Sequence, residues 1–134
     1  MIGIVLAGHG SFCEGIRDAA EMIMGPQEQV AVVPLGPAEN LDLYRKKLED
    51  ARTEVDSGDG VLVLADLFGG SPSNVAAYLL GPNTEVVTGA SLPMLLEVLG
   101  VRESPLSDVV DTAVSAAQVG TIRLADRIRA GGGS

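Results

Sequence analysis

Two side chains that often build reactive sites are almost missing from this sequence. Its 134 residues contain one cysteine, Cys13, and one histidine, His9. A single cysteine cannot form a disulfide within the chain, which is consistent with a reducing compartment. One histidine and one cysteine also argue against a dedicated zinc site, so we expect neither a metal nor a cofactor. We interpret Cys13 as a small packing residue rather than a redox centre.

Aromatic residues are also scarce, although the chain is rich in aliphatic ones. It has no Trp, two Phe and two Tyr, yet 46% of its residues are hydrophobic. An aliphatic core favours strands between layers of helices over an aromatic-rich β-barrel. No apolar run approaches the ~20 residues of a membrane-spanning helix, and no basic residues precede the apolar segment 1–6. We therefore expect a cytoplasmic, soluble protein that begins with a strand rather than a signal peptide.

Basic residues are few compared with acidic ones. Nine Lys and Arg face 18 Asp and Glu, which gives a formal net charge of -9. Such a surface repels nucleic acid and anionic membranes, so we expect neither as a partner. If this acidic protein handles phosphate, the protein that delivers the phosphate is expected to be basic.

Short apolar runs and helical periodicity alternate along the chain. Strands are predicted over 2–7, 29–35, 61–65 and 85–88, with an alternating edge strand over 121–125. Helices are predicted over 14–25, 41–55, 73–80, 92–99 and from residue 107 onward. We expect residues 1–130 to form a single domain and residues 131–134 to be a flexible Gly/Ser tail.

This order of elements predicts an α/β sandwich of three layers around a mostly parallel sheet. In such sheets, ligands bind beyond the carboxyl ends of the strands. Two segments with reactive side chains follow strand ends: Gly8–Ser11 after the first strand and Asp66–Pro72 after the third. If these two strands are neighbours, both segments border one crevice.

His9 is the candidate nucleophile. A neutral imidazole nitrogen is nucleophilic near pH 7, and the flanking glycines, Gly8 and Gly10, leave room for a phosphoryl donor. The other ring nitrogen must then carry a proton and be held in place. A carboxylate does this well, and Asp66 stands at the equivalent end of the third strand. The alternative is that His9 is an ordinary, partly buried histidine and that Asp66 only caps a turn.

The glycine-rich segment after Asp66 is a candidate phosphate-binding loop. Gly69, Gly70 and Ser71 precede a predicted helix and offer backbone N–H groups and a hydroxyl to phosphate oxygens. The segment lacks the Lys of a Walker motif. It is also compatible with an ordinary loop before a helix that starts near Pro72.

Taken together, these segments resemble the mannose-type IIA components of the bacterial phosphoenolpyruvate-dependent sugar phosphotransferase system. The resemblance covers nearly the whole chain. It is carried by Ile4–Gly10, by Met22–Gly25 followed by Gln27, by Asp66–Pro72 with Asn74, by Thr88-Gly89 and by Leu92–Glu97.

The resemblance implies a parallel core in the strand order 2-1-3-4, with a fifth strand over 121–125 exchanged between the subunits of a homodimer. It also implies a phosphotransferase in which His9 is phosphorylated by the phosphocarrier HPr. The group then passes to a IIB component, which hands it to sugar entering through the membrane components IIC and IID. Asp66 would hold the imidazole, and Gly70 and Ser71 would lie against the phosphate.

The sequence departs from the family at a few positions near these motifs. Ser91 replaces a typical Asn, Ser73 replaces a common Phe, and Phe12-Cys13 replaces small residues beside the histidine. No IIB domain follows within the 134 residues, so the acceptor is expected to be a separate polypeptide.

Three other functions fit parts of this pattern. A regulatory module could use the same pocket to signal sugar supply without transport. A related carrier could supply phosphoryl groups to a dihydroxyacetone kinase, although the segment 92–96 resembles the sugar-transport branch. A metal-dependent hydrolase using Asp66 and His9 lacks further side chains with ligand-like spacing.

Overall fold

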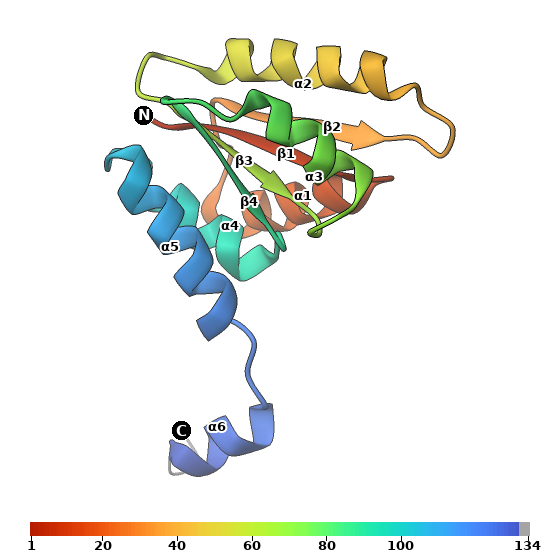
Figure 1. Cartoon of the computed structure of the whole chain (residues 1–134). Helices are drawn as coiled ribbons and strands as arrows, with labels where there is room; N and C mark the ends of the chain where they lie inside the picture. The colour runs from red at the N-terminus through yellow and green to blue at the C-terminus, as the bar shows by residue number, and fades with distance from the viewer. Residues whose placement is uncertain (132–134) are drawn as a thin grey trace.

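The computed structural model describes residues 1–131, in which strands and helices alternate (Figure 1). The strands are β1 (Gly3–His9), β2 (Val30–Leu35), β3 (Val61–Ala65) and β4 (Thr84–Thr88). The helices are α1 (Phe12–Met24), α2 (Leu41–Val55), α3 (Ser71–Ala76), α4 (Leu92–Leu99), α5 (Leu106–Val119) and α6 (Leu124–Ala130), with a 3₁₀ turn, Ala77–Leu79, after α3. The first four predicted strands and all five predicted helices are confirmed, with boundaries within two residues of those predicted when the 3₁₀ turn is counted with α3.

The strands form one parallel sheet in the order β2-β1-β3-β4, as the resemblance implied. Helices α2 and α3 cover one face, and α1, α4 and α5 cover the other (Figure 1). The central strands β1 and β3 are buried on both faces, apart from His9 at the end of β1. Burial on both faces explains why each appears in the sequence as a continuous apolar run rather than an alternating one. The expected three-layer sandwich is therefore confirmed.

Local interactions in the sequence determine where helix α2 begins and which of its side chains face the sheet. The side-chain oxygen of Asn40 accepts the backbone N–H of Leu43 at 3.0 Å and so caps the first turn of α2. The side chains that α2 buries recur at helical spacing: Tyr44, Leu48, Ala51 and Val55. Leu41, the first residue of the helix, is 46% exposed.

At the opposite end of the sheet from His9, Arg102 joins the starts of the two neighbouring strands β1 and β2. Its guanidinium donates to the backbone carbonyls of Ile2 (2.9 Å), Glu28 (2.6 Å) and Gln29 (2.8 Å). The residue is 5% exposed, and burial lowers the pKa of its guanidinium from its usual value. Nothing in the sequence pattern indicated this role, because its partners are backbone atoms more than 70 residues away.

The predicted edge strand over Thr121–Ala125 is absent from the described chain. Residues 121–123 have no regular structure, and Leu124–Ala130 form helix α6, which extends away from the sheet (Figure 1). A strand needs the backbone of a sheet edge to pair with, and the exposed segment 121–130 reaches none within residues 1–131. A helix satisfies the same backbone groups internally. Of the predicted tail, residues 132–134 lie outside the described part.

The last turn of α1 is exposed to solvent. Ile16 and Ala20, earlier in the helix, pack into the core formed by the sheet, α4 and α5. Ile23 continues their helical spacing but is 63% exposed, and Met22 is 88% exposed. Periodicity alone does not show where a helix passes beyond the elements that cover it.

None of the helices within residues 1–131 has the length and apolar character that crossing a membrane requires.

Candidate phosphotransfer site

The order of the strands brings His9 and Asp66 together. β1 lies beside β3, with Ala7 opposite Ala65, so the residues that follow meet at one edge of the sheet. His9 is the last residue of β1 and pairs with Leu35 of β2, whereas the sequence placed it in a loop. Its position in a hydrogen-bonded strand fixes the backbone from which the imidazole projects.

The Asp66 carboxylate holds His9 at two atoms. Its Oδ2 atom lies 2.7 Å from the imidazole Nδ1 and accepts the backbone N–H of His9 at 2.9 Å. Its Oδ1 atom accepts the backbone N–H of Leu67 at 2.9 Å. Partial burial opposes ionisation of this carboxyl, but the hydrogen bonds from His9 and Leu67 outweigh burial and lower the pKa of Asp66. Asp66 is therefore an anion at neutral pH.

An ionised carboxylate selects the tautomer of the imidazole. Because it can only accept hydrogen bonds, the proton lies on Nδ1, and Nε2 keeps its lone pair. The His9 side chain is 51% exposed, whereas that of Asp66 is 10% exposed. Within residues 1–131, no hydrogen bond involves Nε2. The site thus presents one unprotonated nitrogen to solvent.

The two glycines beside His9 are needed for different structural reasons: close packing at Gly8 and backbone conformation at Gly10. A Cβ atom at Gly8 would lie 2.7 Å from Cys13 Sγ and 3.3 Å from Asp66 Cβ, so Gly8 permits β1 to pack against both. Gly10 has a φ of +53°, and a side chain there would meet nothing within 4 Å. Gly10 therefore makes the turn from β1 into α1. The sequence analysis expected both glycines to leave open space beside His9, but only the Gly10 side is open.

Gly70 lies against the imidazole. A Cβ atom at this position would be 2.9 Å from His9 Cε1 and 3.6 Å from Nε2. Ser71 follows as the first residue of α3, and its hydroxyl makes no hydrogen bond within the described residues. The structure thus pairs His9 with Asp66, places Gly70 beside the imidazole and puts Ser71 next in the chain.

Two buried side chains, Tyr44 and Cys13, lie close to Asp66. The Tyr44 hydroxyl donates to the carbonyl of Val33 at 2.6 Å, and burial raises the pKa of Tyr44. Cys13 is fully buried, and burial followed by the nearby Asp66 charge raises the pKa of its thiol to about 12. The prediction that Cys13 is a packing residue agrees with this burial.

Exposed apolar side chains come from the same segments as the site. Phe12, three residues after His9, is 46% exposed, and Leu67 and Phe68, directly after Asp66, are 49% and 87% exposed. Such a group of exposed apolar side chains beside a reactive nitrogen is typical of a surface that another protein covers.

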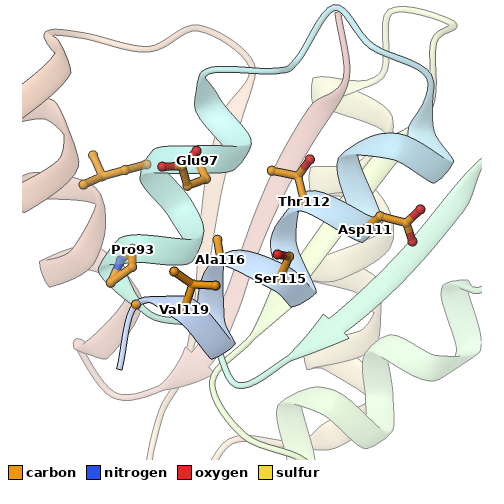
Figure 2. A pocket seen from close by; sticks show the side chains of 9 residues that line it. Pro93, Glu97, Asp111, Thr112, Ser115, Ala116 and Val119 are labelled. Atoms are coloured by element: carbon orange, nitrogen blue, oxygen red, sulfur yellow. The ribbon is translucent and has the colours of Figure 1, made fainter. Parts of the chain in front are cut away.

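Among residues 1–131, no group of three or more His, Cys, Asp or Glu side chains is arranged to hold a metal ion. A groove of about 620 Å³ lies between α4 and α5, with Pro93, Glu97, Asp111 and Val119 in its walls (Figure 2). Neither His9 nor Asp66 lines it.

Comparison with known proteins identifies relatives of both sequence and fold. The sequence profile of a family described as "PTS system fructose IIA component" matches residues 3–114, where PTS denotes the phosphotransferase system. The fructose-specific EIIA component of Bacillus subtilis is 33% identical over 105 residues, which cover 77% of this chain and 72% of that protein. The mannose-specific EIIAB component of Escherichia coli K12 is 35% identical over 123 residues, which cover 89% of this chain but 38% of that longer protein.

Solved structures show the same relationship. A phosphotransferase system component EIIA from Streptococcus agalactiae superposes with a TM-score of 0.85 at 29% identity, covering 94% of this chain and 99% of that one. A PTS IIA protein associated with the fucose utilization operon of Streptococcus pneumoniae gives 0.84 at 32% identity, covering 94% and 95%. Since the profile match and these likenesses extend over the strands that carry His9 and Asp66, the chain belongs to the mannose/fructose-type IIA components of the sugar phosphotransferase system.

Proposed function

We propose that this IIA component carries a phosphoryl group on Nε2 of His9, accepting it from phospho-HPr and passing it to a IIB component. The observation that carries the proposal is the pairing of the imidazole Nδ1 with the Asp66 carboxylate at 2.7 Å. This pairing leaves Nε2 unprotonated, on an imidazole side chain that is 51% exposed. Family membership supports a phosphotransfer role in sugar uptake.

The transfer step needs no proton to leave His9. The lone pair on Nε2 attacks phosphorus, and the bond between phosphorus and the donor atom of HPr breaks as the Nε2–P bond forms. The ring gains positive charge while its Nδ1 proton stays in place. Asp66, which is ionised, stabilises that charge and keeps the ring in one orientation. Transfer to the IIB component reverses these steps with a different partner.

The phosphoryl oxygens would contact the residues on the Nε2 side of the ring. Gly70 lies against this edge of the imidazole, and the hydroxyl of Ser71 is available as a donor. Donors that are already in place stabilise the charge that develops on the oxygens during transfer. Any side chain at position 70 would occupy this space, which supports its assignment to phosphate binding.

The exposed residues Phe12, Leu67 and Phe68 support docking of HPr and of IIB at this edge. The membrane components IIC and IID would act indirectly, through IIB, so the protein is expected to work in the cytoplasm.

We also propose a homodimer in which the segment 121–125 is exchanged, because Ile122 and Leu124 are 51% and 65% exposed in the single chain. Light scattering would then give twice the mass of one chain. A variant that lacks the residues after Gly120 would give the mass of a single chain.

The test of function is phosphorylation by the general phosphotransferase proteins. Incubation with enzyme I, HPr and labelled phosphoenolpyruvate is expected to give a phosphoprotein that is labile to acid and stable to base. His9→Ala should carry no label, while Ser115→Ala, on the exposed side of α5, should be labelled like the native protein. Label that persists in His9→Ala contradicts the assignment. Label that reaches His9 but passes to no IIB component would favour the regulatory alternative.

A further inference from the structure

Two side chains of α3 hold the loop that lies against His9. The Ser73 hydroxyl donates to the carbonyl of Gly70 at 3.0 Å, and the Asn74 side-chain amide donates to the carbonyl of Gly69 at 3.3 Å. The backbone N–H of Asn74 also donates to Gly70, at 3.0 Å. The peptide groups 69–70 and 70–71 are therefore held at their carbonyl ends.

Holding a carbonyl also orients the amide of the same peptide group. In a trans peptide, the C=O and the following N–H point in opposite directions, and the chain has no cis bonds. The N–H groups of Gly70 and Ser71 must therefore point away from Ser73 and Asn74. Neither N–H makes a hydrogen bond within residues 1–131.

We propose that Ser73 and Asn74 are positioning residues, which orient the N–H groups of Gly70 and Ser71 toward a phosphoryl group on His9. This inference rests on the proposed function, because it concerns the residues that hold the phosphate-binding loop of the same site. A Cβ atom at Gly70 would lie 2.9 Å from Cε1 and 3.6 Å from Nε2 of His9, so this peptide borders the ring edge that bears Nε2. Gly69 permits the arrangement with a φ of +87°, a conformation that other residues rarely adopt.

The carbonyl oxygen of Gly70 accepts two hydrogen bonds from α3. The carbonyl of Gly70 already accepts the N–H of Asn74, so the Ser73 hydroxyl adds a second donor to the same oxygen. Ser73 is 7% exposed, which restricts its hydroxyl to this partner. Asn74, by contrast, is exposed, and its amide contacts the loop from the surface. The two residues therefore restrain the loop from different sides.

The variants Ser73→Ala and Asn74→Leu remove one restraint each. Asn74→Leu keeps the branched shape of the side chain at an exposed position, so it serves if Ser73→Ala folds poorly. Ser115→Ala is the matched control, since its hydroxyl lies in the α4–α5 groove. Each protein is mixed with phospho-HPr, and the equilibrium between phosphorylated forms is measured together with the backbone amide NMR spectrum.

In the native protein, phosphorylation should shift the amide signals of Gly70 and Ser71 strongly downfield. Each variant should reduce that shift and move the equilibrium about tenfold toward phospho-HPr, the size expected for one hydrogen bond. A purely structural role would lower the melting temperature and leave both readouts unchanged. Unchanged shifts and equilibrium in folded variants that accept label on His9 overturn this inference alone. A native protein that takes no label overturns the proposed function, and this inference with it.

Discussion

One carboxylate oxygen of Asp66 contacts both the backbone and the ring of His9. Oδ2 accepts the His9 N–H at 2.9 Å and lies 2.7 Å from the imidazole Nδ1. The same atom therefore fixes the end of β1 and the orientation of the ring that projects from it. Because the residues meet through neighbouring strands, the rigid sheet maintains the pairing.

Replacing Asp66 with Asn is expected to slow phosphoryl acceptance on the order of 10–100-fold. The amide removes the negative charge that stabilises the ring during transfer, and it can offer N–H groups where the carboxylate only accepts. The measurement is the initial rate of label transfer from phospho-HPr. The melting curve of the variant serves as the control for folding. A variant that is folded and reacts at the native rate would show that Asp66 is not needed.

The pH dependence of stability should contain a contribution from Asp66. Its pKa in the folded protein is below its usual value of 3.8, so its stabilising effect is complete above that value. The effect is lost as the pH falls through the lower, folded-state pKa. Urea unfolding between pH 7 and pH 2.5 should show a steeper acid decline for the native protein than for Asp66→Asn. Parallel curves would contradict the lowered pKa.

Substituting Ala for Gly8 should destabilise the fold by about 1–3 kcal/mol, because the added Cβ would lie 2.7 Å from Cys13 Sγ. The double variant with Cys13→Ala should recover part of this loss, since that change removes the sulfur. Recovery should be incomplete, because Asp66 Cβ remains 3.3 Å away. Denaturant unfolding of the two single variants and the double variant measures the coupling. Additive losses would mean that Gly8 and Cys13 do not interact.

Arg102→Leu should lower the free energy of unfolding by roughly 2–4 kcal/mol, because it removes the guanidinium hydrogen bonds that join the starts of β1 and β2 and leaves the buried Ile2 carbonyl without a donor. His9 lies at the other end of β1, so the folded variant should still accept label. The exposed Arg129→Leu provides the comparison and should unfold like the native protein. A loss of labelling by folded Arg102→Leu would mean that the two ends of the strand are coupled.

Local patterns predicted those parts of the structure that depend on neighbouring residues. Helical periodicity predicted α2, and short apolar runs predicted β1 and β3. The prediction over Thr121–Ala125 was wrong for the single chain, because alternation shows that a segment can pair but does not supply the edge to pair with. The exposed Ile23 shows the same limit for a helix.

The sequence by itself determined the strands, the segments at their carboxyl ends and the presence of one histidine and one aspartate there. Only the tertiary structure decided that β1 and β3 are neighbours, which turns residues 57 positions apart into a bonded pair. It also showed that Gly8 allows packing beneath the site, and that Ser73 and Asn74 hold the loop beside the ring. These contacts depend on distances between segments remote in the chain. Such distances are set by the packing of the sheet and helices as a whole, which no local pattern contains.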